Sequence, residues 1–127
     1  GSKILSKTFN QHGWDTVTID NNPDLKADIC DNVYNYLSDE SIKSICNGKI
    51  PEVIWASPDC QTYSVAAITK HRYQTIEGHL KPKTEYGKFC DEGNTKLVNY
   101  FKHYNGLYFI ENKKLSLENI SIQVSTR

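Results

Sequence analysis

The pattern of apolar and polar positions changes along the chain between the period of a helix and the period of a strand, and the first stretch has the helical period. In "SKILSKTFNQHG" the residues Ile4, Leu5 and Phe9 recur at helical spacing, and Gly13 can end the helix. The next stretch, "WDTVTID", alternates and is rich in β-branched residues, which predicts a strand ending at Asp20. "NNPD" then predicts a turn, and "KADIC" predicts a short strand or a strand edge.

Two further helices are predicted downstream. "SDESIKSICNGK" begins with a capping serine and acidic residues, and it places Ile42, Ile45 and Cys46 on one face. "DEGNTKLVNYFKHYNG" predicts a longer helix with an inward apolar face. The residues expected on that face are Leu97, Val98 and Phe101.

Continuously apolar runs at 53–57 and 107–111 predict two strands that are covered on both sides. Residues 67–90, broken by Gly78 and Gly87, predict a long polar loop between them. Strands that alternate with helices favour an α/β fold, with a parallel sheet and helices on each face. In such sheets ligands bind at the carboxyl ends of the strands.

Composition narrows the class of protein. The chain has 127 residues, which is about one domain, and 38% of them are hydrophobic. Its 15 basic and 15 acidic residues balance, so it lacks the basic excess typical of a dedicated nucleic-acid binder. Its apolar runs are too short to span a bilayer. The four cysteines show no CxxC pairing and no metal-type spacing with histidine, which favours reduced thiols and no metal site.

Four side chains with useful chemistry fall near predicted strand ends, and each has an ordinary structural alternative. Asp20 could accept the hydrogen bonds of a ribose diol, or simply begin a turn. Asp28 could bind an adenine amino group, or be a solvated loop acid. Cys60 could be a nucleophile or a small buried apolar group, although its polar setting suits the second role poorly. Glu111 could be a general acid or an ordinary acid at a strand end.

Six stretches, taken in order, resemble the DNA cytosine C5-methyltransferases, most closely their phage and prophage branch. That family carries a Pro-Cys nucleophile loop followed later by a Glu-Asn motif. The resemblance covers residue 1 to about residue 112 and gains its weight from the order of the motifs. The matching stretches are "GSKILSKTF", "TVTID", "ADI", "WASPDCQTYSVAAITKHR", "PKTEYGKFCD" and "YFIEN".

The resemblance implies a Rossmann-like methyltransferase fold, with S-adenosylmethionine as methyl donor and double-stranded DNA as partner. Cys60 would attack C6 of a flipped-out cytosine, and Glu111 would hydrogen-bond N3 and the amino group of that base. C5 would then take the methyl group and lose its proton, and Cys60 would leave. The positions matching the cofactor site are Gly1, Ser2, Asp20, Asn21, Asp28, Ile29 and Pro58, and the DNA contacts match Gln61, Thr62 and Ser64. The implied location is the cytoplasm of a bacterial or phage-infected cell.

The chain also departs from the family pattern. Asp59 stands where the family mostly has proline, and a neighbouring carboxylate is expected to raise the pKa of the Cys60 thiol. Residues 1–127 are expected to be a partial catalytic domain, incomplete at both ends, without a target-recognition domain. The family's first strand, central in its sheet, has no counterpart before Gly1. We therefore expect another segment, a second copy or a partner chain to complete the sheet.

Two other readings stay open. The chain could be a catalytically inactive remnant that binds nucleic acid or protein. It could also be a methyltransferase of the same fold that acts on RNA. The enzyme reading requires a reactive Cys60 and a cofactor pocket, and the remnant reading requires neither.

Overall fold

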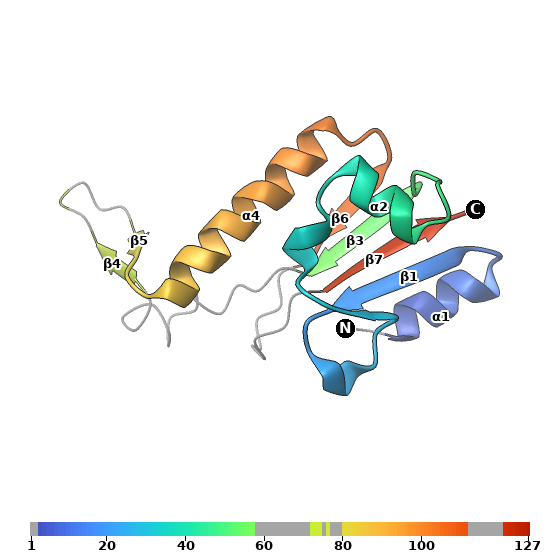
Figure 1. Cartoon of the computed structure of the whole chain (residues 1–127), viewed down its shortest axis with the longest axis horizontal. Coiled ribbons are helices and arrows are strands. Elements are labelled where there is room, and N and C mark those ends of the chain that lie inside the picture. Colours follow the sequence, from blue (N-terminus) through green and yellow to red (C-terminus); the bar gives the residue numbers. More distant parts are fainter. Residues whose placement is uncertain (1–2, 58–71, 75, 77–79, 112–120) are drawn as a thin grey trace.

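A computed structural model describes residues 3–57, 72–74, 76, 80–111 and 121–127. Its centre is a five-stranded sheet with strand order β2-β1-β7-β3-β6, and β4 and β5 form a separate antiparallel pair (Figure 1). The strands of the large sheet are β1 (Asp15–Asp20), β2 (Ile29–Cys30), β3 (Val53–Ser57), β6 (Leu107–Ile110) and β7 (Ser121–Thr126). The pair consists of β4 (Arg72–Gln74) and β5 (Leu80–Pro82).

β7 occupies the middle of the sheet and runs against its neighbours. It pairs in antiparallel fashion with β1 on one side and with β3 on the other, whereas the β1–β2 and β3–β6 pairs are parallel (Figure 1). The sheet is therefore mixed, where the sequence favoured a mostly parallel one. β7, which joins the β1–β2 pair to the β3–β6 pair, lies within "LSLENISIQVSTR", a stretch that carries no recognised motif.

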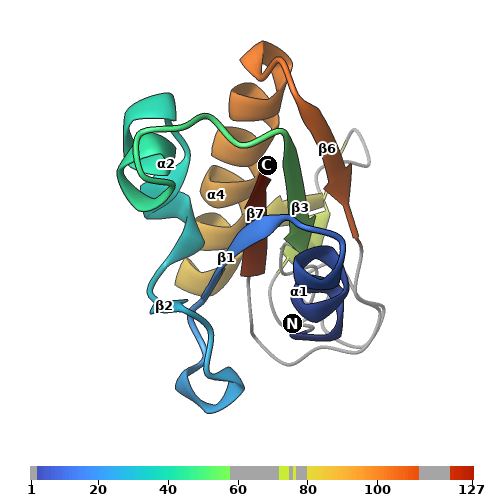
Figure 2. The same cartoon turned by 90° about the vertical axis from the view of Figure 1, so that its right-hand side faces the viewer.

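Helices lie on both faces of this sheet (Figure 2). α1 (Lys3–Gln11) lies on one face, and α2 (Asp39–Ile45) and α4 (Glu85–His103) lie on the other (Figure 2). Two short 3-10 helices, η1 (Pro23–Leu25) and η2 (Val33–Tyr36), follow β1 and β2. None of the helices in the described part of the chain has the length and apolar character needed to cross a bilayer.

The hydrophobic core lies between the sheet and the layer formed by η2, α2 and α4. Directly opposite residues put Ile19, Ile122 and Ala56 in one row across β1, β7 and β3. All three are at most 2% exposed, and they belong to the same buried cluster as Ile42 of α2 and Phe101 of α4. The alternation of β7 thus supplies the central apolar row of the core.

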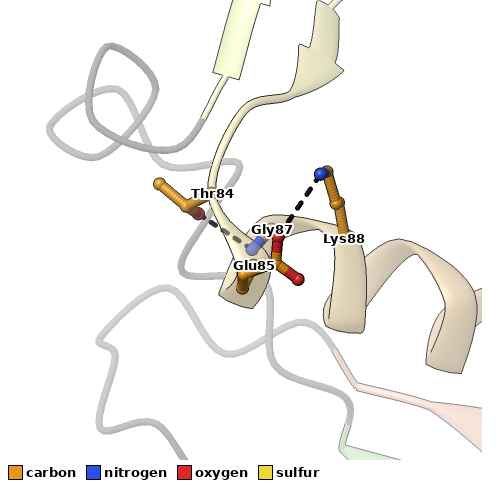
Figure 3. A network of polar contacts seen from close by, with 4 residues as sticks. All are labelled: Thr84, Glu85, Gly87 and Lys88. Carbon is orange, nitrogen blue, oxygen red and sulfur yellow. Dashed lines mark hydrogen bonds and ion pairs between the residues drawn. The ribbon is translucent and has the colours of Figure 1, made fainter.

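The elements predicted near the amino terminus are confirmed, but α4 is longer than predicted. It begins at Glu85, inside the expected loop, because Thr84 caps it: Thr84 Oγ1 accepts a hydrogen bond from the Gly87 amide at 3.0 Å (Figure 3). Glu85 Oε1 also lies 3.4 Å from Lys88 Nζ, one turn on (Figure 3). The sequence prediction treated Gly87 as a break, whereas it is the third residue of the helix.

Two predictions about burial are wrong. On α4, Leu97 and Phe101 are buried as predicted, but Val98 is 47% exposed because it lies about 100° around the helix from Leu97. The four residues of β6 were expected in a strand covered on both faces, and all of them are exposed. β6 is the edge strand, so only β3 lies beside it within the described sheet.

Candidate functional site at the carboxyl edge of the sheet

Five strand ends meet at one edge of the large sheet. β1, β2, β3 and β6 all run toward it, and the antiparallel β7 begins there (Figure 1). Ligands of α/β sheets bind at this carboxyl edge.

Three polar residues form a row across this edge. Asp20, the last residue of β1, lies directly opposite Ser121 of β7, and Ser121 lies directly opposite Ser57, the last residue of β3. Directly opposite residues point to the same face with Cβ atoms about 4.5–5.5 Å apart. Ile19 and Ala56, one residue earlier on β1 and β3, face the core, so the row faces the other way, toward the side of α1.

Asp20 is a buried carboxylate with one oxygen engaged. The residue is 3% exposed, and Oδ1 accepts a hydrogen bond from the Asn22 amide at 2.8 Å. Within the described residues, Oδ2 accepts no hydrogen bond. Buried polar atoms almost always have a partner, so the second oxygen calls for one outside these residues. A ligand hydroxyl or a water could supply it.

Glu111 stands at the other end of the same edge, directly after β6. Its Oε2 accepts hydrogen bonds from Trp55 Nε1 at 3.2 Å and from Ser57 Oγ at 3.3 Å. Its amide donates to the carbonyl of Ala56 at 2.8 Å, which continues the β3–β6 ladder by one residue. One carboxylate oxygen is thus fixed by β3, while no described residue donates to Oε1.

Asp28 lies away from the edge row. It directly precedes β2 and flanks Thr18 in the middle of β1. Its Oδ2 accepts hydrogen bonds from the Thr18 amide at 2.9 Å and from Thr18 Oγ1 at 3.1 Å. This carboxylate therefore ties β2 to β1, which is a structural role that the sequence did not suggest.

The other predicted cofactor residues are divided between described and undescribed parts of the chain. The carbonyl of Asn21 lies 3.9 Å from Cys30 Sγ at the end of β2, and Ile29 packs against the core. Seven predicted site residues lie outside the described residues. These are Gly1, Ser2, Pro58, Cys60, Gln61, Thr62 and Ser64.

Sequence reasoning missed several residues at this edge. Trp55 and Ser57 hold Glu111, and their shared face follows from the alternation along β3, which could have been read from the sequence. Ser121 could not have been found, because the place of β7 in the sheet was unknown. Asp31 follows β2, and hydrogen bonds from the Asn32 amide and then from the Tyr36 hydroxyl lower the pKa of its carboxyl.

Among the described residues, a metal centre and a disulfide find no support. In the part of the chain that the structure describes, no cluster of three His, Cys, Asp or Glu side chains could hold a metal ion. Cys30 is exposed and Cys46 is buried, and neither forms a disulfide. A cavity of about 450 Å³ opens between η2 and α4, with Lys96 and Tyr100 in its lining, and none of its lining residues belongs to the edge row.

Comparison with family models, curated proteins and solved structures finds no match to this chain. The case for a function therefore depends on the residues themselves and on their arrangement.

Proposed function

We propose that this chain is part of a methyltransferase that transfers the methyl group of S-adenosylmethionine to C5 of cytosine in DNA. The observation that carries the proposal is the carboxyl edge of the sheet, which holds the buried Asp20 carboxylate at one end and the hydrogen-bonded Glu111 carboxylate at the other. Asp20 and Glu111 are two of the three described acids that the sequence places near strand ends, and the third, Asp28, is engaged by Thr18. Both lie at the carboxyl edge.

The cofactor half of the proposal concerns Asp20. Its oxygen Oδ2 has no donor among the described residues, and a ribose hydroxyl is a suitable one. Oδ1 is held by the Asn22 amide, so the carboxylate is already oriented before a ligand binds. When bound, S-adenosylmethionine would supply an electrophilic methyl group at this edge.

The base half concerns Glu111 and Cys60. The "SPDC" stretch that carries Cys60 starts at Ser57, whose hydroxyl binds Glu111. In the proposed reaction the Cys60 thiolate adds to C6 of the flipped cytosine, and Glu111 binds N3 and the amino group. Trp55 and Ser57 hold Oε2, which leaves Oε1 to meet the base without a large loss of side-chain entropy.

Calorimetry with S-adenosylhomocysteine tests the cofactor half. We expect measurable binding to the unaltered chain and at least a tenfold weaker affinity for Asp20→Ala. Asp15→Ala is the matched control, because Asp15 begins the same strand at the opposite edge. Equal affinities for all three proteins would remove Asp20 from the site. Unfolding curves of each variant separate a lost ligand contact from a lost fold.

A second candidate function, binding without catalysis, is favoured by β7. Ligands of open α/β sheets bind where neighbouring strands part, and here β7 fills the space between β1 and β3 with Ser121 at the edge. DNA containing 5-fluorocytosine, incubated with S-adenosylmethionine, distinguishes the two. A covalent adduct that is lost in Cys60→Ser supports methyl transfer, whereas DNA binding without an adduct supports the binding module.

A further inference from the structure

We propose that the cavity between η2 and α4 binds a small organic anion, whose acidic group meets Lys96 and Asn99 of α4. The cavity opens on the face of the sheet that carries α2 and α4 (Figure 2). Its volume of about 450 Å³ lies within the range of roughly 300–1,000 Å³ that is typical of small-molecule sites. None of its lining residues belongs to the edge row, so this site does not depend on the proposed methyl transfer.

Two tyrosine hydroxyls hold the walls of the cavity together, one at each end. The hydroxyl of Tyr34, in η2, donates to Asn94 Oδ1 of α4 at 3.1 Å. The hydroxyl of Tyr100, in α4, donates to Asp39 Oδ1 of α2 at 3.0 Å. Asn94 and Tyr100 are separated by about 9 Å along the axis of α4. That length suits a single ring with an acidic group attached.

Both of these contacts are fixed without a ligand. Gly93 is buried beside Tyr34, and a Cβ atom at this glycine would collide with the tyrosine ring. The same ring packs edge-to-face on Phe89, with centroids 5.4 Å apart. At the other end, burial and then the hydrogen bond to Asp39 raise the pKa of Tyr100, so its hydroxyl keeps the proton that it donates. The walls are therefore held in place beforehand, which lowers the cost of ordering them on binding.

The charge of the lining favours an anion. Among the residues that line the cavity, Lys96 is the charged one, and within the described chain it forms no ion pair. Glu92, one turn earlier on α4, is exposed and does not pair with it. Asp39 lies outside the lining and already accepts the bond from Tyr100. A negatively charged ligand would thus meet an available cation without facing a carboxylate in the lining.

Asn99 supplies a neutral donor beside this charge. It follows Lys96 by three residues on α4, so the two side chains lie on the same face of the helix. The Ser38 hydroxyl on the opposite wall is already bonded to Ser41, whereas no described residue bonds to the side-chain amide of Asn99. An ammonium and an amide in this arrangement can donate to the oxygens of one carboxylate or one phosphate.

The apolar part of the lining determines the body of the ligand. Leu37 and Tyr100 are half-buried, and both pack against the core with part of their surface left open. A ring placed against them is removed from water, whereas a bare ion gains nothing from this surface. The ligand class is therefore a small carboxylate or phosphate ester that carries an apolar group.

An NMR titration of the isotope-labelled full chain tests the ligand class. Benzoate and phenyl phosphate should shift the side-chain amide of Asn99 and the backbone amides of Asn35 and Leu37 until the shifts saturate. Acetate lacks the ring and benzyl alcohol lacks the charge, so each should bind at least tenfold more weakly. Tighter binding of benzoate assigns the site to carboxylates, and tighter binding of phenyl phosphate assigns it to phosphate esters.

Three substitutions test the residues. Lys96→Gln removes the charge and should weaken benzoate and phenyl phosphate at least tenfold, and Asn99→Asp, which keeps the shape but adds a negative charge, should abolish their binding. Lys102→Gln removes an exposed lysine of α4 outside the cavity and should leave both affinities unchanged. All three residues are exposed, and unfolding curves check that each variant is folded. Saturating shifts that are absent in the unaltered chain, or that persist unchanged in Lys96→Gln and Asn99→Asp, would overturn the proposal. Equal binding of benzyl alcohol and benzoate would overturn the role of the charge.

Discussion

The place of β7 between β1 and β3 predicts that a single truncation in this strand will destabilise the whole sheet. Ile122 is the most informative position, because it lies directly opposite Ile19 on one side and Ala56 on the other. It is 2% exposed and belongs to the main core cluster. We therefore choose Ile122→Ala as the perturbation.

The expected magnitude follows from the size of the side chain. The substitution removes three carbon atoms, which at about 0.8 kcal/mol each gives about 2.4 kcal/mol of lost transfer free energy. The cavity left between two neighbouring strands adds to this, so a total of about 2–5 kcal/mol is expected. Domains of this size are stable by only about 5–15 kcal/mol, so the loss is a large part of the total.

Urea unfolding followed by circular dichroism measures the change. Ile122→Ala should lower the midpoint by at least about 1 M without altering the slope. Val98→Ala is the control, because Val98 is 47% exposed on α4, and its effect should stay within about 0.5 kcal/mol. An Ile122→Ala effect as small as that of Val98→Ala would refute the central position of β7.

Two smaller predictions concern α4. Thr84→Ala removes the side chain that caps the Gly87 amide, so it should lower the free energy of unfolding by about 1 kcal/mol in the same assay. Thr95→Ala, inside the helix, is the comparison, and equal losses in the two variants would contradict a capping role for Thr84. Burial raises the pKa of Tyr104 to about 12, above its usual value near 10, so the protonated form is favoured in the folded chain. Stability should therefore be retained below about pH 10 and decline as the pH rises toward 12, and Tyr104→Phe should weaken this decline. Identical pH profiles of the urea midpoint in the unaltered chain and in Tyr104→Phe would contradict this role of Tyr104.

Local sequence patterns were sufficient to predict most of the helices and strands. The helix at α1 and the strand at β1 end where Gly13 and Asp20 predict, because the residues that end these elements are neighbours in sequence. Gly13 has a φ of +86°, a conformation that glycine adopts without strain. Asp20 and Glu111 were likewise placed at strand ends by simple pattern.

The order of the strands in the sheet, and contacts between residues far apart in the sequence, could not be predicted from such local patterns. "LYFI" has the composition of a buried strand, and it is exposed only because no described strand lies outside β6. The edge position depends on the order of strands, which is a property of the whole sheet. Likewise, the role of Asp28 depends on its pairing with Thr18, ten residues earlier in sequence.

The alternation along β7 joins the stability of the sheet to its candidate site. Ile122 and Val124 face the core, while Ser121 and Gln123 face the side on which the edge row lies. Gln123 is 6% exposed, and its Nε2 donates to Ser125 Oγ at 3.2 Å, so the polar face of the strand satisfies part of its own hydrogen bonding. A parallel strand in the same place would end at this edge, whereas β7 begins there. Ser121 thus directly joins the ends of β1 and β3, and the strand that fills the middle of the sheet also completes the row from Asp20 to Ser57, whose hydroxyl binds Glu111.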